Sequence, residues 1–351
     1  MASSKQDGTA AATEQLGSMS LGESAERKEN ETEPTPKNGT KTKKLCSACE
    51  KESDTLKTCN GCQCVWYCDK KCQNKHRKEH KKECRLIKKV LDKRGGKLDI
   101  GTEEDIGPLG KLTPREECHI CMQVLPIHPN LHSYAACCGK KICGGCDFQH
   151  GRKNTERTCP FCRTAAPGSD EETLAQLRKR VERKDPQALL SMAIIYGEGL
   201  LGLSVDHAKC IALMRQAADL GLPGAQWMLG NFYRDGEMGL EQSEEEVLKY
   251  LGKAAKVGHT TAQSNLGCIA GEKGYYVAAM CLFRLSASGG QKVSMENLIE
   301  YFEHGLLRHA DLAESLQAMY CARAEMRSQD RDKYVVHLKI TGEYYAEFDD
   351  I

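Results

Sequence analysis

Hydrophobic residues in the second half of the chain follow a helical period. Leu174, Leu177 and Val181 recur three to four residues apart, the spacing that places side chains on one face of a helix. Ser169 followed by Glu172 is a capping box, which predicts that this helix begins near 170. The pattern predicts a mostly α-helical fold from 169 onward.

The same helical pattern then repeats along the chain. Successive units are 37 residues apart and carry alanine at equivalent positions, namely Ala188, Ala225 and Ala262. Each unit has the order helix, Gly-rich loop, helix, turn, and a shorter third unit ends near Gly289. Such a period is typical of an α-α solenoid built from stacked helix hairpins. We predict this solenoid at 169–326, with a degenerate third unit and room for a fourth up to about Met326, and a C-terminal tail at 327–351.

The first half of the chain has a different sequence pattern, in which cysteine is dense. Sixteen of the 20 cysteines lie between Cys46 and Cys162, and five pairs have two residues between the thiols. The N-terminus has no hydrophobic segment typical of a secretory signal, so we expect a reducing compartment, cytoplasm or nucleus. There, dense C-x2-C pairs indicate tetrahedral zinc sites rather than disulfides.

Composition narrows the remaining possibilities. The net charge is +1, which does not point to a nucleic acid, and no apolar run reaches the roughly 20 residues of a membrane span. Residues 1–44 are polar and have almost no large apolar side chains, so we expect a disordered tail. Residues 86–114 resemble a helix end followed by a Gly-rich linker.

The first cysteine cluster, residues 45–85, offers eight ligands for two zinc ions. His80 and Cys84 are four residues apart on a predicted helix, so they share a face. The order of ligands, with the segments VWYC and CQ, resembles the MYND zinc finger. That resemblance implies two interleaved sites, one of Cys46, Cys49, Cys68 and Cys72 and one of Cys59, Cys62, His80 and Cys84. Two residues are left over. We expect Cys64 to be buried, with a place among the ligands as the alternative, and His76 to be solvated.

Sites with four protein ligands are closed, so zinc there is structural. A module of about 40 residues has too little core to fold alone, and metal binding supplies its folding energy. The MYND resemblance implies that the module binds short proline-containing peptides of partner proteins. Basic residues exceed acidic ones by ten between Lys41 and Arg94, but we expect a solvated helix face rather than a nucleic-acid site.

The second cluster, residues 115–166, resembles a RING finger. The cross-braced pairing of that family implies one zinc on Cys118, Cys121, Cys143 and Cys146. It places a second zinc on Cys138, Cys159 and Cys162. The usual histidine of the second site is absent, since CCGKKIC has Lys140 there. We take adjacent Cys137 as the fourth ligand; His132 and His150 are the less favoured alternatives.

The RING resemblance raises the question of ubiquitin transfer. Active members dock a ubiquitin-conjugating enzyme on an apolar residue in the first C-x2-C pair and on an arginine after the last cysteine. Ile120, Pro160 and Arg163 match those positions. The central tryptophan common in active RING fingers is absent, with Phe148 nearby. A RING-shaped module without transfer activity is the alternative.

The repeats resemble Sel1-like repeats, relatives of tetratricopeptide repeats that bind partner proteins on a concave surface. The matching segments are ALLSMAIIYGEGLLGLSVDHAKCIALMRQAADLG and AQWMLGNFYRDGEMGLEQSEEEVLKYLGKAAKVG. We expect four large side chains here to belong to the core: Met192, Tyr196, Trp227 and Tyr233. We expect four cysteines to be buried thiols: Cys210, Cys268, Cys281 and Cys321. The chain as a whole predicts a scaffold of protein-binding modules with four zinc ions; the alternative is a RING-type ubiquitin ligase.

Overall fold

A computed structural model describes residues 45–53, 55–93, 115–128, 131–154 and 158–342. The expected disordered tail at 1–44 and most of the expected linker lie outside these residues. We call residues 45–93 the first module, and residues 115–154 with 158–166 the second module. No helix in the described part of the chain is both long and apolar enough to cross a membrane.

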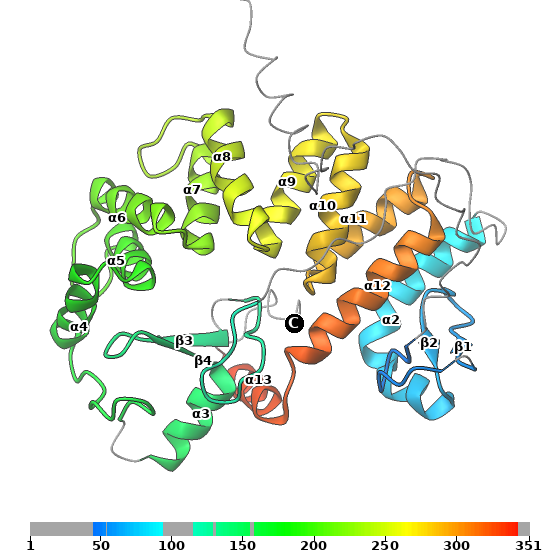
Figure 1. Cartoon of the computed structure of the whole chain (residues 1–351), viewed down its shortest axis with the longest axis horizontal. Helices are drawn as coiled ribbons and strands as arrows, with labels where there is room; N and C mark the ends of the chain where they lie inside the picture. Colours follow the sequence, from blue (N-terminus) through cyan, green and yellow to red (C-terminus); the bar gives the residue numbers. More distant parts are fainter. Residues whose placement is uncertain (1–44, 54, 94–114, 129–130, 155–157, 343–351) are drawn as a thin grey trace, which may run out of the picture.

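Ten helices of the second half follow one another along an arc (Figure 1). They are α4 (Asp170–Glu182), α5 (Pro186–Glu198), α6 (His207–Asp219), α7 (Pro223–Asp235), α8 (Glu244–Lys256), α9 (Thr260–Glu272), α10 (Tyr276–Ser288), α11 (Lys292–Glu303), α12 (His309–Glu325) and α13 (Gln329–Thr341). Consecutive helices from α4 to α12 pack on one another, as a solenoid requires, and we call these nine the helical array. The predicted cap is present, since Ser169 Oγ accepts a hydrogen bond from Glu172 N at 3.3 Å.

Small residues let the array helices approach closely. A Cβ added to Gly230 on α7 would lie 2.7 Å from the Leu251 side chain on α8, and one on Gly267 would lie 2.7 Å from the ring of Phe283 on α10. The predicted core aromatic and methionine residues are buried or pack partly buried against the core. Of the four array cysteines only Cys210 is buried. Cys268 is exposed and the other two are half-buried, so the expectation of core thiols was wrong for Cys268.

The first module is a two-stranded hairpin followed by one long helix. Strand β1 (Lys57–Thr58) pairs antiparallel with β2 (Trp66–Tyr67), and α2 (Lys70–Lys93) follows. The helix continues past 85 because Ile87, Val90 and Leu91 form an apolar face. That face joins one hydrophobic cluster with buried residues of α11 and α12, so the module shares its core with the last repeat.

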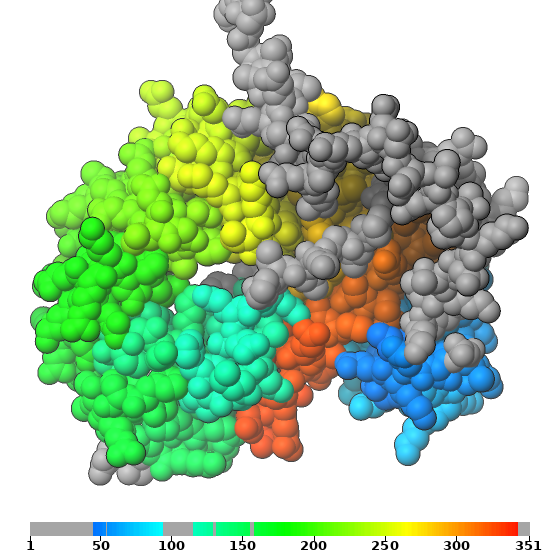
Figure 2. All heavy atoms as spheres, viewed as in Figure 1, coloured from blue at the N-terminus to red at the C-terminus, as the bar shows by residue number. Residues whose placement is uncertain are grey.

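The second module lies between the two ends of the arc (Figure 1). Strand β3 (His132–Ala135) pairs antiparallel with β4 (Lys140–Cys143), and α3 (Gly144–Lys153) follows directly. On one side Tyr134 Oη donates to Asp185 Oδ2 at 2.8 Å, at the start of α5. On the other side α3 packs against α13. In the space-filling view this module fills the opening of the arc (Figure 2).

The predicted C-terminal tail is corrected by α13. Residues Gln329–Thr341 form a helix that Ser328 caps by accepting a hydrogen bond from Arg331 N at 3.3 Å. Only Arg331 and Leu338 of this helix are buried. Its apolar residues do not form a continuous stripe along one face of the helix. The helix is stabilised by packing on the second module, a tertiary contact that periodicity does not show.

Candidate metal centres

Four of the five C-x2-C pairs form the same tight turn. In each, the residue after the second cysteine has a left-handed backbone with φ of 57–59° and donates its N–H to the carbonyl of the first cysteine at 2.8–3.0 Å. The four residues are Glu50, Gln63, Met122 and Arg163. Non-glycine residues rarely adopt this conformation, and it persists where surrounding structure enforces it. The turn aims both thiols of a pair to the same side, as a shared metal ion demands.

The structure gathers the sixteen predicted ligands into four groups of four, within each of which all ligand atoms lie within 4.8 Å of one another. The groups are Cys46, Cys49, Cys68 and Cys72; Cys59, Cys62, His80 and Cys84; Cys118, Cys121, Cys143 and Cys146; and Cys137, Cys138, Cys159 and Cys162. We number them clusters one to four in this order. The first two are interleaved and the last two are cross-braced, as the resemblances imply.

Sulfur spacings fit zinc. In a tetrahedron with a Zn–S bond of about 2.3 Å, two sulfurs lie about 3.8 Å apart. One pair from each cluster can be compared: 3.6 Å for Cys49 and Cys68, 3.7 Å for Cys59 and Cys84, 3.9 Å for Cys121 and Cys143, and 3.7 Å for Cys138 and Cys159. The donor sets therefore match zinc in both number and spacing.

Cys137 is the fourth member of cluster four. Its sulfur lies 3.4 Å from Cys162 Sγ. His150, an alternative considered from the sequence, is instead within hydrogen-bonding distance of Thr158 O at 2.6 Å. His132 lies outside the cluster, and burial lowers its pKa to about 4.

Backbone N–H groups favour the thiolate form of the first cysteine in each module. Burial by itself raises the pKa of Cys118, but backbone N–H groups, those of Cys121 and Cys143 foremost, lower it to about 7. The pKa of Cys46 is lowered to about 7 in the same way, against burial. The thiolate is the form that binds metal, so the backbone around Cys46 and Cys118 favours metal binding by these two thiols.

His76 corrects an expectation: it is buried rather than solvated. The Tyr67 hydroxyl lies 3.0 Å from His76 Nδ1, and the His76 ring meets the Tyr320 ring edge-on at 4.4 Å. Burial and the neighbouring His80 lower the pKa of His76 to about 4. Cys64 is buried, as expected, with its sulfur 3.3 Å from His309 Nε2 of α12.

The helical array completes the surroundings of cluster two. His80 Nε2 lies 3.3 Å from Cys62 Sγ, and the other ring nitrogen, Nδ1, lies 3.2 Å from the Tyr320 hydroxyl. The same hydroxyl donates to Glu83 Oε2 at 3.2 Å. Partners of this kind fix the orientation and tautomer of a metal-ligating histidine. Sequence spacing could not identify Tyr320, because it lies 240 residues from His80.

The first helix of the array, α4, contacts the backbone of cluster four. Arg180 on α4 donates to Ala136 O at 3.2 Å and to Cys137 O at 3.3 Å. The positive φ of Gly139 also brings this turn against α4, where a Cβ would lie 2.9 Å from Arg180 Nη1. Both modules are therefore in direct contact with the helical array.

The residues predicted to dock a ubiquitin-conjugating enzyme lie on neighbouring surface loops. Ile120 is 43% exposed, Arg163 is exposed and Pro160 is half-buried. The rings of His119 and Phe161 meet edge-on at 6.1 Å, which brings the first and last cysteine turns together.

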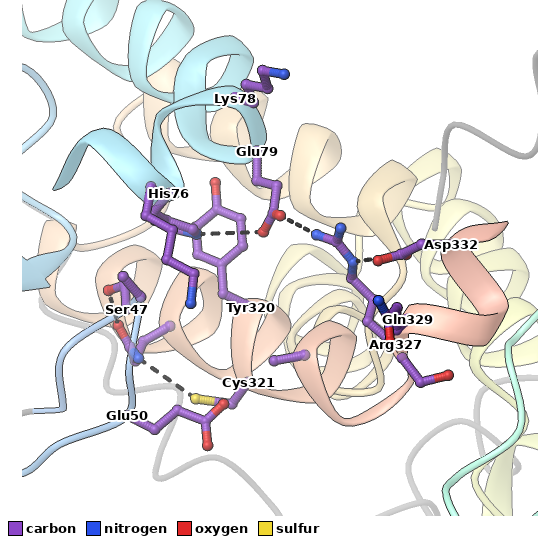
Figure 3. A pocket seen from close by; sticks show the side chains of 15 residues that line it. Ser47, Glu50, His76, Lys78, Glu79, Tyr320, Cys321, Arg327, Gln329 and Asp332 are labelled. Atoms are coloured by element: carbon purple, nitrogen blue, oxygen red, sulfur yellow. Dashed lines mark hydrogen bonds and ion pairs between the residues drawn. The ribbon is translucent and has the colours of Figure 1, made fainter. Parts of the chain in front are cut away.

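A cavity of about 470 Å³ opens between the first module and α12 (Figure 3). It is lined by the turn at Ser47, by His76 and Glu79 of α2, and by Tyr320 and Ala324 of α12, among others. Arg327 closes one side through ion pairs with Glu79 and Asp332. The lining mixes apolar surface with charges of both signs.

Comparison with known proteins identifies two of these parts. A model of the MYND finger family matches residues 46–84, and a model of the Sel1 repeat family matches 186–222 and 223–259. These two repeats are the α5–α6 and α7–α8 hairpins. Histone-lysine N-methyltransferase ASHR1 of Arabidopsis thaliana is 38% identical over 53 residues. This stretch is 15% of the present chain and only 11% of that protein.

Two solved structures have chains similar to this one. A Sel1 repeat protein from Oxalobacter formigenes is 29% identical with a TM-score of 0.34, over 36% of this chain and 98% of that one. The antigen c5321 of uropathogenic Escherichia coli, described as having an SLR fold, is 27% identical with a TM-score of 0.37, over 48% of this chain and 36% of that one. On the strength of the two family models, the chain contains a MYND finger and Sel1 repeats.

Proposed function

We propose that the protein is an interaction scaffold stabilised by four zinc ions, two in the MYND finger and two in the second module. The observation that carries the proposal is that each cluster offers four ligands, which fills a tetrahedral zinc ion and leaves no position for a substrate. When bound, zinc cross-links chain segments that are too small to hold a core. MYND fingers and Sel1 repeats are both protein-interaction modules in general.

The cavity between the finger and α12 is our candidate for the peptide site of the MYND finger. It lies beside the first cysteine turn, at Ser47 and Glu50, and its volume suits a few side chains of an extended peptide. The proposed occupant is a proline-containing segment of a partner protein, because a preformed extended peptide loses little entropy on binding.

A substitution that fills the cavity tests this site. Ala324→Trp places an indole at the cavity wall on an exposed position of α12 and touches no zinc ligand. Ala212→Trp, exposed on α6, is the matched control. In fluorescence polarisation with a panel of proline-containing peptides, we expect binding to the full chain and to A212W but not to A324W. Peptide binding that A324W leaves intact would place the site elsewhere.

A second candidate function is ubiquitin transfer by the second module. The exposure of Ile120 beside the last cysteine turn is the observation that favours it. A RING-type ligase holds the charged conjugating enzyme in a reactive pose and needs no catalytic side chain of its own.

An in vitro ubiquitination assay with a panel of conjugating enzymes separates the two functions. Ile120→Ala should abolish transfer, whereas Leu200→Ala, an equally exposed leucine after α5, should not affect it. If the panel gives no transfer with the zinc-loaded wild-type chain, the ligase is excluded and the scaffold remains.

A further inference from the structure

Two glycines between zinc ligands mark an unusually close contact with the C-terminal helix. Gly144 and Gly145 separate Cys143 from Cys146 at the start of α3, and both are buried. A Cβ on Gly144 would overlap the ring of Tyr334, and one on Gly145 would lie 2.6 Å from the backbone nitrogen of Arg331. Helix α13 therefore packs directly on the backbone that carries two ligands of cluster three (Figure 1).

Arg331 extends from α13 to the other ligand loop of the same cluster. It is 6% exposed and donates to Val124 O at 2.6 Å, to Gln123 O at 3.3 Å and to Cys121 Sγ at 3.6 Å. A further bond to Met326 O ties the guanidinium to the end of α12. One side chain thus joins the cysteine loop, the last array helix and α13.

The charge of Arg331 needs an anionic partner. Among the described residues it forms no ion pair with a carboxylate, although a buried guanidinium without a counter-charge is costly. Four thiolates around one Zn²⁺ carry a net charge of −2. Cluster three, with the Cys121 sulfur in contact, is therefore the group that can balance this cation.

We propose that Arg331 is a positioning residue of the third zinc site, supplied from outside the module, so that zinc in cluster three and docking of α13 stabilise each other. The inference rests on zinc occupying this cluster, as proposed above. Because Tyr134 and Arg180 hold the opposite side of the module to α4 and α5, zinc at cluster three also joins the two ends of the helical array. Coupling of this kind is reciprocal: a loosened α13 must weaken zinc retention as much as lost zinc loosens α13.

The test combines zinc release with hydrogen exchange on the full chain. Partners outside the first ligand shell typically change metal affinity 10- to 100-fold. We therefore expect Arg331→Met to release one of the four zinc ions at least about tenfold faster to a colorimetric chelator, and residues 329–341 to lose exchange protection. Arg331→Lys, which keeps the charge, should retain part of the wild-type zinc affinity and part of the exchange protection of 329–341.

The control is Arg284→Met, because Arg284 is also buried but pairs with Asp311 and Glu314 in the array. It should lower the melting temperature and leave zinc release from cluster three unchanged. If R331M does not fold, the wild-type chain provides the same test: removal of zinc from cluster three, recognised by alkylation of its freed cysteines, must deprotect 329–341. An R331M chain that holds four zinc ions and releases them at the wild-type rate would overturn this inference alone. So would an α13 that keeps its exchange protection after that removal. A chain with zinc only in the MYND finger would overturn it together with the four-zinc proposal.

Discussion

Substitution of Tyr320 by phenylalanine tests whether the finger and the last repeat fold as one unit. The Tyr320 hydroxyl lies 3.2 Å from both His80 Nδ1 and Glu83 Oε2, and all three side chains are buried. Tyr320→Phe removes this hydroxyl and keeps the ring, so a zinc-ligating histidine and a buried carboxylate both lose a partner.

The expected cost follows from those two bonds. A buried polar group left without its partner costs about 1–3 kcal/mol. Because bound water can replace part of the loss, we expect the free energy of unfolding to fall by about 2 kcal/mol. In a chain of this size that corresponds to a drop in Tm of about 3 °C. Zinc release from cluster two should accelerate in parallel, since His80 loses the contact that orients it.

Scanning calorimetry and chelator kinetics on the zinc-loaded chain measure both effects. Tyr250→Phe is the matched control: Tyr250 is equally buried, stacks on Tyr233 at 5.9 Å and lies in the array. It should shift Tm by less than the Tyr320 variant and leave zinc release unchanged. Equal melting temperatures and equal release rates in the two variants would refute the shared unit.

Two further predictions concern the array. His259 caps α9 through Nδ1 and stacks on Trp227 at 5.6 Å, and burial lowers its pKa to about 4. As the pH falls, the His259 ring takes up a proton in the unfolded chain before it does so in the folded chain. The stability present above pH 6.5 is therefore lost as the pH falls towards 4. An NMR titration midpoint for His259 near 6.5 would contradict this. Gly230→Ala overpacks Leu251 and should cost about 1–3 kcal/mol in urea unfolding, whereas Gly151→Ala, with open space around it, should cost nothing; equal midpoints would disprove the close contact.

The zinc ligands and the repeats could be predicted because their signals are local. A C-x2-C pair predicts the turn that it forms, and the 37-residue period repeats from one helix hairpin to the next. The choice of Cys137 came from the resemblance to RING fingers, and in the structure Cys137 lies in cluster four. In each case the residues that define the feature are close in sequence or repeat at a fixed spacing.

What could not be predicted depends on contacts between distant segments. His76 appeared solvated because its helix is rich in lysine, yet Tyr67 and Tyr320 bury it. Helix α13 has no apolar stripe, and its partner is the second module. The adjacent glycines 144 and 145 were the one local signal of that contact, because a pair without Cβ atoms permits backbone approach.

The zinc content of the intact chain tests the central claim most directly. Native mass spectrometry of protein purified under reducing conditions should show four zinc ions per chain and no disulfide. Stepwise acidification should then release the metal and unfold both modules. An ordered, metal-free chain, or one whose cysteines between Cys46 and Cys162 are joined as disulfides, would contradict the account.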